Sequence, residues 1–417
     1  MTTKAGGRPL HILFYSPDSY GLGHVRRTIS LAERVLGQFR DASALVLTGA
    51  PRAHYFRYPS RCDYVKLPSV TKGVDGCYKT REIDMPLDDT VHLRSRVIQE
   101  TAASFHADVI VVDHSPLGLC GEVVPTLDSC AVGRTGTVRI LGLRDVIDEP
   151  EAVRASWKRD QVMEVLRRCY DRILVYGQRE VFDPVEAYGM PEDVAAKLEF
   201  VGYIGRNGVN TAPRDVRRKF APRTGRLVVL TVGGGGDGNQ LVRLFLEGCE
   251  RLGDQLPFET VIVTGPLMSP RKRKRFEARA HRLEGVSALE YCDDLPGLCR
   301  AADFVVAMGG YNTVCELAYG GIPALIVPRT FPRKEQLERA RRLAERGVVR
   351  FLVPEEATPE TLMREVHLGM GLPRPPRRWG LDFSGLDRTA RAIGRLVPSR
   401  SGPSMRPGRL RARRLQP

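Results

Sequence analysis

The chain has 417 residues, of which 42% are hydrophobic, and it carries a formal net charge of +15. This length suits two or three domains, and the composition excludes a chain that is disordered as a whole. No run of ~18 apolar residues occurs and the N-terminus has no long apolar segment, so we expect neither a membrane span nor a signal peptide. The cytoplasm is the expected compartment.

The positive charge is concentrated near the C-terminus. Residues 371–417 contain twelve arginines and two aspartates, a net charge of +10, which leaves +5 for the rest of the chain. Because the excess does not cover a folded face, we do not expect a nucleic-acid partner. The basic segment 398–417 is predicted to be disordered. It either attracts an anionic membrane surface, at ~1 kcal/mol per charge, or has no role.

The cysteine pattern indicates reduced thiols. The chain has nine cysteines, an odd number, and no C-x-x-C pair. Neither a disulfide framework nor a zinc site is therefore expected, and we predict no metal ion and no cofactor.

The first half of the chain alternates predicted strands and helices. Strands are expected at 10–17, 43–49, 108–116, 138–146, 172–178 and 198–206, and helices at 25–39, 88–105, 116–130 and 151–170. Such alternation predicts a parallel sheet covered by helices on both faces.

The same pattern restarts after a polar stretch at 207–225, which we interpret as a linker with a short helix. Strands are expected within 226–238, 258–266, 286–310, 323–328 and 348–353, and helices within 239–252, 270–284, 286–310, 311–320, 333–347, 358–370 and 383–397. The basic run 271–275 follows Ser269-Pro270 and is interpreted as the solvated opening of a helix.

The fold class is therefore α/β, with two Rossmann-like doubly wound parallel-sheet domains that face each other across a cleft. The predicted units are an N-terminal Rossmann-like domain (1–206), the linker (207–225), a C-terminal Rossmann-like domain (226–378), a closing helix that packs back toward the N-terminal domain (379–397) and the tail (398–417). In such sheets ligands bind beyond the carboxyl ends of the strands.

The first glycine loop, "SPDSYGLGHVRR", places a histidine at a helix start. Gly21 and Gly23 allow a tight turn, and His24 would face the cleft with its imidazole kept neutral by the helix N-terminus. A structural, hydrogen-bonded histidine is the alternative. Asp113 ends a strand in the layer where it could orient His24, as in a His-Asp pair, or it could cap the helix predicted at 116–130.

Two further stretches predict a phosphate site. In "TVGGGGDGNQ", Gly233, Gly234, Gly235 and Gly236 expose amides at a helix start. In "MGGYNTVCELAYGGIPALIVPR", Gly309 and Gly310 leave room for a diphosphate, Asn312 and Thr313 add donors, and Glu316 is suited to two ribose hydroxyls. Glu335 and Gln336 could then bind sugar hydroxyls. The alternative is that these polar residues only cap the helix.

The pattern "MGGYNTVCE…GGIPALIVP…EQ" resembles the donor-binding signature of the GT-B glycosyltransferases. It is similar to that of the UDP-glycosyltransferases and of the peptidoglycan lipid-intermediate N-acetylglucosaminyltransferase family. The resemblance implies that 1–206 is the acceptor-side domain and 226–378 the nucleotide-sugar domain. The resemblance implies diphosphate contacts for Gly310, Asn312 and Thr313, a ribose contact for Glu316, and sugar contacts for Glu335 and Gln336. "GLGHVRR" is similar to the family loop whose histidine is the catalytic base, assisted by an aspartate at a position like that of Asp113.

The sequence departs from these families at Met308, where plant-type relatives have a histidine. The second glutamate of the retaining branch would also fall at Met308 and is absent, which favours inversion. The resemblance implies a glycosyltransferase that moves a sugar from a nucleotide-diphosphate sugar, UDP-linked, to a hydroxyl of a small-molecule or lipid-linked acceptor. The alternatives are a sugar-nucleotide epimerase of the same fold and a non-catalytic nucleotide-sugar-binding protein.

Overall fold

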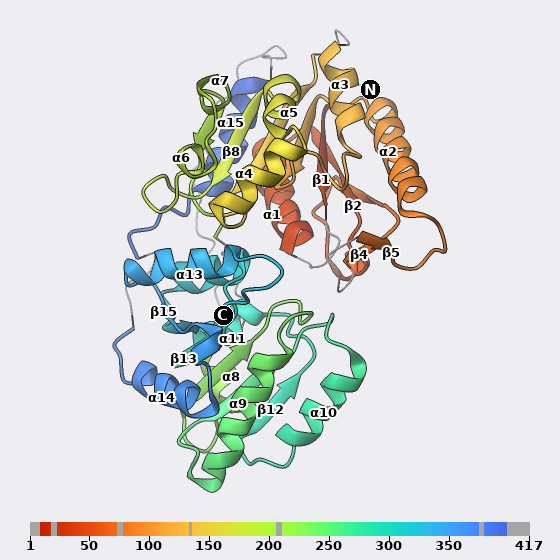
Figure 1. Ribbon diagram of the computed structural model, residues 1–417. Helices are drawn as coiled ribbons and strands as arrows, with labels where there is room; N and C mark the ends of the chain where they lie inside the picture. Colours follow the sequence, from red (N-terminus) through yellow and green to blue (C-terminus); the bar gives the residue numbers. More distant parts are fainter. Residues whose placement is uncertain are drawn as a thin grey trace, which may run out of the picture.

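The structure, a computed structural model, describes residues 9–17, 23–72, 78–132, 136–205, 211–374 and 379–397. Two α/β units are stacked, with the N-terminal unit in the upper half of Figure 1 and the C-terminal unit in the lower half. The predicted fold of two doubly wound parallel-sheet domains is confirmed. The predicted domain boundaries remain a prediction, and Gly21 and the tail 398–417 lie outside the described residues.

The N-terminal sheet has seven parallel strands in the order β3-β2-β1-β6-β7-β8-β9. Their bounds are Cys62–Lys66, Ala42–Thr48, Leu10–Ser16, Val109–Asp113, Val138–Arg144, Arg172–Tyr176 and Leu198–Phe200. The order reverses between β1 and β6, which pair in register from Ile12 with Val109. Ligands bind at this kind of reversal, because two neighbouring connections leave in opposite directions and open a crevice.

Alternate residues of β1 are buried on opposite faces of this sheet. Ile12 and Phe14 pack in one core cluster with residues of α1 (Gly23–Gln38), whereas Leu13 and Tyr15 pack in another with residues of α2 (Leu87–Ser104). Both faces are therefore apolar, as the continuous apolar strands predict. The other helices of this half are α3 (Val124–Val132), α4 (Pro150–Arg159), α5 (Val162–Cys169), α6 (Pro184–Tyr188) and α7 (Glu192–Ala195), and a small antiparallel pair joins β4 (Val70–Lys72) to β5 (Tyr78–Thr80).

The C-terminal sheet has six parallel strands in the order β12-β11-β10-β13-β14-β15. Their bounds are Val286–Leu289, Glu259–Val263, Leu227–Thr231, Phe304–Ala307, Ala324–Ile326 and Arg350–Phe351. The helices are α8 (Pro213–Phe220), α9 (Asn239–Leu252), α10 (Pro270–Ala280), α11 (Leu295–Ala301), α12 (Tyr311–Gly320), α13 (Glu335–Glu345) and α14 (Pro359–Met370). Here the order reverses between β10 and β13, so each domain contributes one crevice.

The last helix, α15 (Gly385–Leu396), lies among the helices of the N-terminal domain (Figure 1). It packs on α1, where the Gln38 side-chain amide donates to the Ala390 carbonyl at 3.3 Å and Arg34 pairs with Asp387. The chain thus crosses back to its first domain and ties the two halves together.

Two predicted helices differ from the structure. The helix predicted at 116–130 begins only at Val124, because Gly118, Cys120 and Gly121 all have positive φ (70°, 48° and 88°) and form turns. The alternative in which Asp113 caps that helix is therefore wrong. The helix predicted at 151–170 is two helices, since Gln161 between them has φ 51°.

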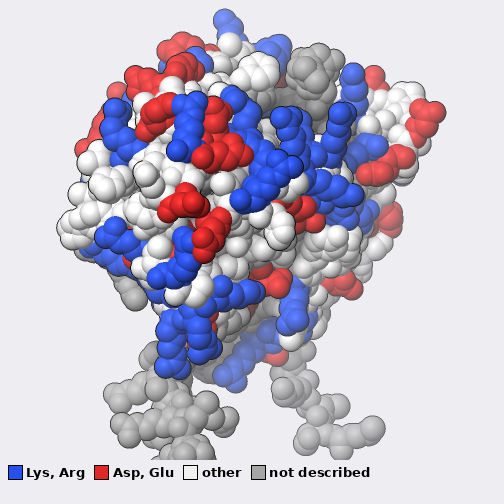
Figure 2. Space-filling model, turned by 90° about the horizontal axis from the view of Figure 1, so that it is seen from below, with Lys and Arg blue, Asp and Glu red and all other residues white. Residues whose placement is uncertain are grey.

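The basic run 271–275 forms the first turns of α10, and Ser269 caps this helix as predicted by accepting from the Lys272 amide. Arg271, Lys272, Lys274 and Arg275 are exposed. The view from below shows Lys and Arg side chains interspersed with Asp and Glu over much of the surface (Figure 2). Within the described ranges, no helix is both long and apolar enough to span a bilayer.

Candidate active site

A cleft of about 1270 Å³ separates the carboxyl ends of the two sheets. Its walls come from both domains: the start of α1 and the segments after β6 and β7 on one side, and the segments after β10, β13 and β14 on the other. Both strand-order reversals open into this one space, which makes it the candidate site.

His24 and Asp113 meet at the reversal of the N-terminal sheet. The Nδ1 atom of His24, in the first turn of α1, lies 2.7 Å from Oδ2 of Asp113, the last residue of β6. Because a carboxylate only accepts, Nδ1 carries the proton and donates it to Asp113. Arg27, one turn further along α1, donates from Nε and Nη2 to the two oxygens of Asp113 at 2.9 and 2.6 Å. The carboxylate is fixed from two sides and in turn fixes the imidazole.

The electrostatic environment of His24, Asp113 and Arg27 keeps the histidine neutral and the aspartate charged. Burial, assisted by the nearby cations of Arg27 and Arg144, lowers the pKa of His24 to about 4, although Asp113 opposes this shift. Burial alone would raise the pKa of Asp113, but Arg27 and His24 together lower it to about 2. At neutral pH the pair is therefore imidazole and carboxylate, the state in which a histidine can accept a proton.

A second histidine lies beside the first. The rings of His114 and His24 stack with centroids 5.3 Å apart. His114 has φ 68°, a left-handed conformation that turns the chain sharply after β6, and its Nε2 lies 2.6 Å from Nη2 of Arg144, the last residue of β7. Both residues line the cleft.

The glycine run predicted to bind phosphate forms a tight turn after β10 and lines the opposite wall, with Gly233, Gly234, Gly235 and Gly236 all facing the cleft. Gly235 has φ 92°, and a Cβ atom there would lie 2.2 Å from the Thr264 carbonyl oxygen. Only glycine fits this close approach of two backbone segments. The run therefore shapes the turn, in which the Gly235 amide donates to the Val232 carbonyl at 3.2 Å. It precedes α9, whose N-cap is Gly238, so the four glycines do not form the helix start that the sequence predicts.

The start of α12 contributes most of the other predicted donor-site residues. Gly310 is the N-cap, with no side chain to cap the helix, and Asn312, Thr313 and Glu316 line the cleft within its first turns. Asn312 also reaches the other domain, since its Nδ2 donates to the Gly23 carbonyl at 2.9 Å.

Gly309 is placed differently from the other predicted residues, because it does not line the cleft. A Cβ atom there would lie 2.8 Å from the Gln336 carbonyl oxygen, and its own carbonyl accepts from Arg339 at 3.1 Å. Its lack of a side chain lets the segment before α12 pack against α13.

Glu335 and Gln336 open α13 and line the cleft, but both are buried and engaged by one arginine. Glu335 accepts from Nη2 of Arg329 at 2.6 Å, and the Gln336 side chain accepts from the Arg329 amide at 3.3 Å. Arg329 also pairs with Asp237 of the glycine turn at 3.1 Å. Arg329 thereby links the predicted sugar-binding pair to the predicted phosphate loop.

Several functional-site residues were missed at the sequence level: Arg27, His114, Arg144, Arg329 and Arg339. Arg27 and His114 had a local signal, because Arg27 lies three residues after His24 in "GHVRR" and His114 directly follows Asp113 in "VDHSP". Arg144 and Arg339 are recognisable only through contacts with residues distant in sequence, His114 and Asp145, and Arg329 through its contact with Asp237. Among the residues that the structure describes, no group of three His, Cys, Asp or Glu side chains could hold a metal ion.

Comparison with known sequences matches residues 228–370 to the glycosyltransferase family 28 C-terminal domain. An uncharacterized glycosyltransferase of Methanopyrus kandleri is 28% identical over 55% of this chain and 62% of its own length. The UDP-N-acetylglucosamine–N-acetylmuramyl-(pentapeptide) pyrophosphoryl-undecaprenol N-acetylglucosamine transferase of Mannheimia succiniciproducens is 30% identical over 40% of this chain and 46% of its own length. The chain thus spans about half to three fifths of the length of these relatives.

Solved structures match over nearly the whole chain. The glycosyltransferase of kitacinnamycin aligns with a TM-score of 0.60 at 16% identity, covering 94% of this chain and all of that one. The UDP-GlcNAc 2-epimerase of Methanocaldococcus jannaschii aligns with a TM-score of 0.59 at 11% identity, covering 93% and 99%. At these identities the likeness concerns the fold alone. The chain therefore has the GT-B fold, and its residues 228–370 match the glycosyltransferase family 28 C-terminal domain.

Proposed function

We propose that this protein transfers a sugar from a nucleotide-diphosphate sugar to a hydroxyl group of an acceptor. The observation that carries the proposal is the arrangement across the cleft. A neutral histidine oriented by a buried carboxylate stands on one wall, and a glycine turn and an open helix start form the other. A base and an anion site that face each other suit a displacement in which a diphosphate leaves.

The donor would lie on the C-terminal wall. Its diphosphate would rest against the glycine turn at 233–236 and the start of α12, where backbone amides and the helix dipole stabilise negative charge. Glu316 would accept hydrogen bonds from the ribose, and Glu335 and Gln336 would contact the sugar. A UDP-linked donor is the expected one, by likeness to the named relatives.

The acceptor would lie on the N-terminal wall. Nε2 of His24 would remove the proton from the acceptor hydroxyl as that oxygen attacks the anomeric carbon from the side opposite the diphosphate. The proton passes to His24, the new bond forms at the sugar, and the diphosphate leaves with the bonding electron pair. Asp113 stabilises the imidazolium that results. This displacement inverts the anomeric centre, and we propose that the amides and helix dipole replace a metal ion at the leaving group.

A lipid-linked acceptor is one form of this proposal, because the Mannheimia relative is named for a pyrophosphoryl-undecaprenol substrate. Part of the N-terminal wall is apolar and includes Leu117, Ile147, Val153 and Trp157. The arginines in 398–417 would then assist at an anionic membrane surface. Co-sedimentation with anionic and neutral liposomes, with and without residues 398–417, tests this part separately. Equal sedimentation of both forms argues against a role for the tail.

Calorimetric titration with UDP, GDP, ADP and TDP tests the donor site. We expect heat with at least one nucleoside diphosphate, and no heat with folded protein would refute the proposal. The shared fold of the solved epimerase makes sugar-nucleotide epimerisation the second candidate. Incubation with UDP-N-acetylglucosamine alone separates the two, since a C2 epimer among the products would favour the epimerase, whereas hydrolysis or no reaction favours transfer.

A further inference from the structure

Arg144 is a cleft cation that forms no direct ion pair with a carboxylate of the described residues, although the more distant Glu335 and Asp113 favour its charged form. Its Nη2 donates to a ring nitrogen, Nε2 of His114, at 2.6 Å. Its Nε is buried without a hydrogen-bond partner. Arg144 itself lines the cleft. A guanidinium held in this way keeps its full charge for a ligand.

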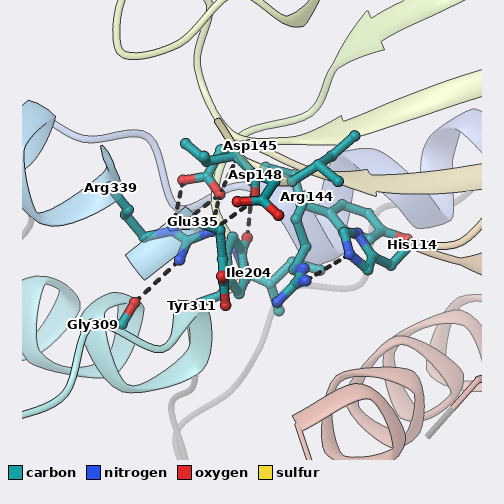
Figure 3. A network of polar contacts seen from close by, with 12 residues as sticks. His114, Arg144, Asp145, Asp148, Ile204, Gly309, Tyr311, Glu335 and Arg339 are labelled. Carbon is teal, nitrogen blue, oxygen red and sulfur yellow. Dashed lines mark hydrogen bonds and ion pairs between the residues drawn. The ribbon is translucent and has the colours of Figure 1, made fainter. Parts of the chain in front are cut away.

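Two neighbouring arginines show the contrast. Arg27 is neutralised by Asp113, and Arg339 is neutralised by Asp145 at 2.9 Å with both side chains about 1% exposed. Figure 3 shows Arg144 pointing toward His114 while Arg339 points toward Asp145. Burial, together with the cations of Arg27 and Arg339, lowers the pKa of Arg144 to about 9, so the side chain is crowded by like charges yet still cationic at neutral pH. An added anion would relieve this repulsion.

His114 is suited to hold Arg144 without cancelling its charge. A guanidinium only donates, so Nε2 of His114 is the acceptor and its proton sits on Nδ1. Burial and the Arg144 cation keep the pKa of His114 well below its usual value, so the ring stays neutral. An aspartate at position 114 would instead form an ion pair with Arg144 and neutralise its charge.

The position of Arg144 assigns the anion to one substrate. Arg144 ends β7 and His114 follows β6, both on the N-terminal wall, and the His114 ring stacks on His24. The predicted diphosphate site at 233–236 belongs to the opposite wall.

We propose that Arg144 binds an oxyanion, a phosphate or a carboxylate, carried by the acceptor near the hydroxyl that reacts, with His114 as the residue that positions it. This proposal rests on the proposed function, because it presupposes an acceptor on the wall of His24. It names a substrate class: acceptors with a negative group close to the reacting hydroxyl.

The test uses inorganic phosphate as the probe and the full-length protein. Phosphate binding is measured by ³¹P NMR line broadening, first without nucleotide and then with saturating UDP, which blocks the donor diphosphate site. The variants are Arg144→Gln and the matched control Arg159→Gln, which removes an exposed cleft-lining arginine paired with Asp160. Thermal unfolding of each variant confirms that it is folded.

With UDP bound, we expect phosphate to bind the wild type and Arg159→Gln alike and to bind Arg144→Gln about tenfold more weakly or worse, as for a lost charged hydrogen bond. His114→Gln, which keeps an acceptor for Nη2, should weaken phosphate binding less than His114→Ala. Equal binding to Arg144→Gln and the wild type overturns the proposal, and so does the absence of phosphate binding. If UDP displaces the phosphate that depends on Arg144, the subsite belongs to the donor and the acceptor assignment is wrong.

Failure of the proposed function gives a different result. In that case no nucleoside diphosphate binds, whereas the nucleotide-free titration still reports whether phosphate binding depends on Arg144.

Discussion

Asp145 and Arg339 form a buried ion pair that joins the two domains. Asp145 follows β7 in the N-terminal domain, Arg339 lies in α13 of the C-terminal domain, and Nη2 of Arg339 is 2.9 Å from Oδ1 of Asp145. Arg339 also donates to the Val146 carbonyl at 3.0 Å and to the Gly309 carbonyl at 3.1 Å, the latter contact being drawn in Figure 3. All three guanidinium nitrogens of Arg339 thus have hydrogen-bond acceptors. Buried charges are tolerated in proteins when they are paired and hydrogen-bonded in this way.

Breaking this pair should destabilise the folded chain. We expect Arg339→Met to leave the Asp145 carboxylate buried and unpaired and to lower the apparent free energy of unfolding by about 3–5 kcal/mol, measured by urea denaturation. Arg34→Ala is the control, because it removes an exposed pair with Asp387 and should cost at most about 1 kcal/mol. Equal losses in the two variants would contradict the assigned role of the buried pair.

Removal of the imidazole should affect turnover more than donor binding. We expect His24→Gln to lower kcat by about 10²–10⁴-fold, the usual contribution of a positioned base, while the affinity for the nucleoside diphosphate stays close to that of the wild type. Steady-state rates and calorimetry measure the two effects. His281→Gln, an exposed histidine after α10, is the control and should change neither. Full activity in His24→Gln would rule out His24 as the base.

The lowered pKa of His24 predicts how stability depends on pH. With a pKa of about 4 in the folded chain and about 6.5 when unfolded, the unfolded state binds the proton first as the pH falls. The wild type should therefore lose stability relative to His24→Gln between about pH 6.5 and pH 4, by about 3 kcal/mol. Urea midpoints across this range measure the difference, and parallel curves for the two proteins would contradict it.

The turn after β10 should tolerate no side chain at Gly235. Alanine there must adopt φ 92° and displace the Thr264 carbonyl, so we expect Gly235→Ala to lose more than about 1 kcal/mol of stability and to bind nucleotide weakly. Gly225→Ala is the matched control, with a similar φ of 67° but open space around the added methyl group. It should lose about 1 kcal/mol and keep nucleotide binding, as measured by thermal shift. Comparable nucleotide affinity in both variants would exclude the turn from the donor site.

Glu316 should contribute to donor affinity and little to the chemical step. We expect Glu316→Gln to weaken binding of the nucleoside diphosphate about tenfold, as for a lost charged hydrogen bond, with a smaller change in kcat. The control is Glu345→Gln, an exposed glutamate at the end of α13. Unchanged affinity in Glu316→Gln would remove this residue from the ribose site.

The fold was predictable because its signals are local. A window of a few residues is enough to predict the apolar strands β1 and β6, the glycine turns and the helix start at Tyr311. The order of strands and helices then leaves few topologies, since parallel connections are right-handed. The prediction of a helix at 116–130 was wrong in its first half. It relied on the helical spacing of apolar residues and gave too little weight to Gly118 and Gly121, whose positive φ angles interrupt a helix.

The site was only partly predictable, because its pairings join distant residues. Asp113 and His24 could be matched because Asp113 ends one strand and His24 opens the helix that follows another, which places both at the carboxyl edge of one sheet. Asp145 and Arg339 are 194 positions apart and sit in different domains, so no local spacing connects them. The His114–Arg144 contact depends on the left-handed backbone at His114, which the sequence does not reveal.

The hydrogen bond from Asn312 to the Gly23 carbonyl links the start of α12 to the start of α1. Gly23 directly precedes His24, and Asn312 belongs to the helix start proposed to grip the diphosphate. A nucleotide that binds the Asn312 side-chain amide would break its hydrogen bond to Gly23. The start of α1, which carries His24, would then shift before the acceptor binds. We therefore expect an ordered kinetic mechanism, in which the nucleotide sugar binds first and the nucleoside diphosphate leaves last. The nucleoside diphosphate should then inhibit competitively against the nucleotide sugar and not against the acceptor.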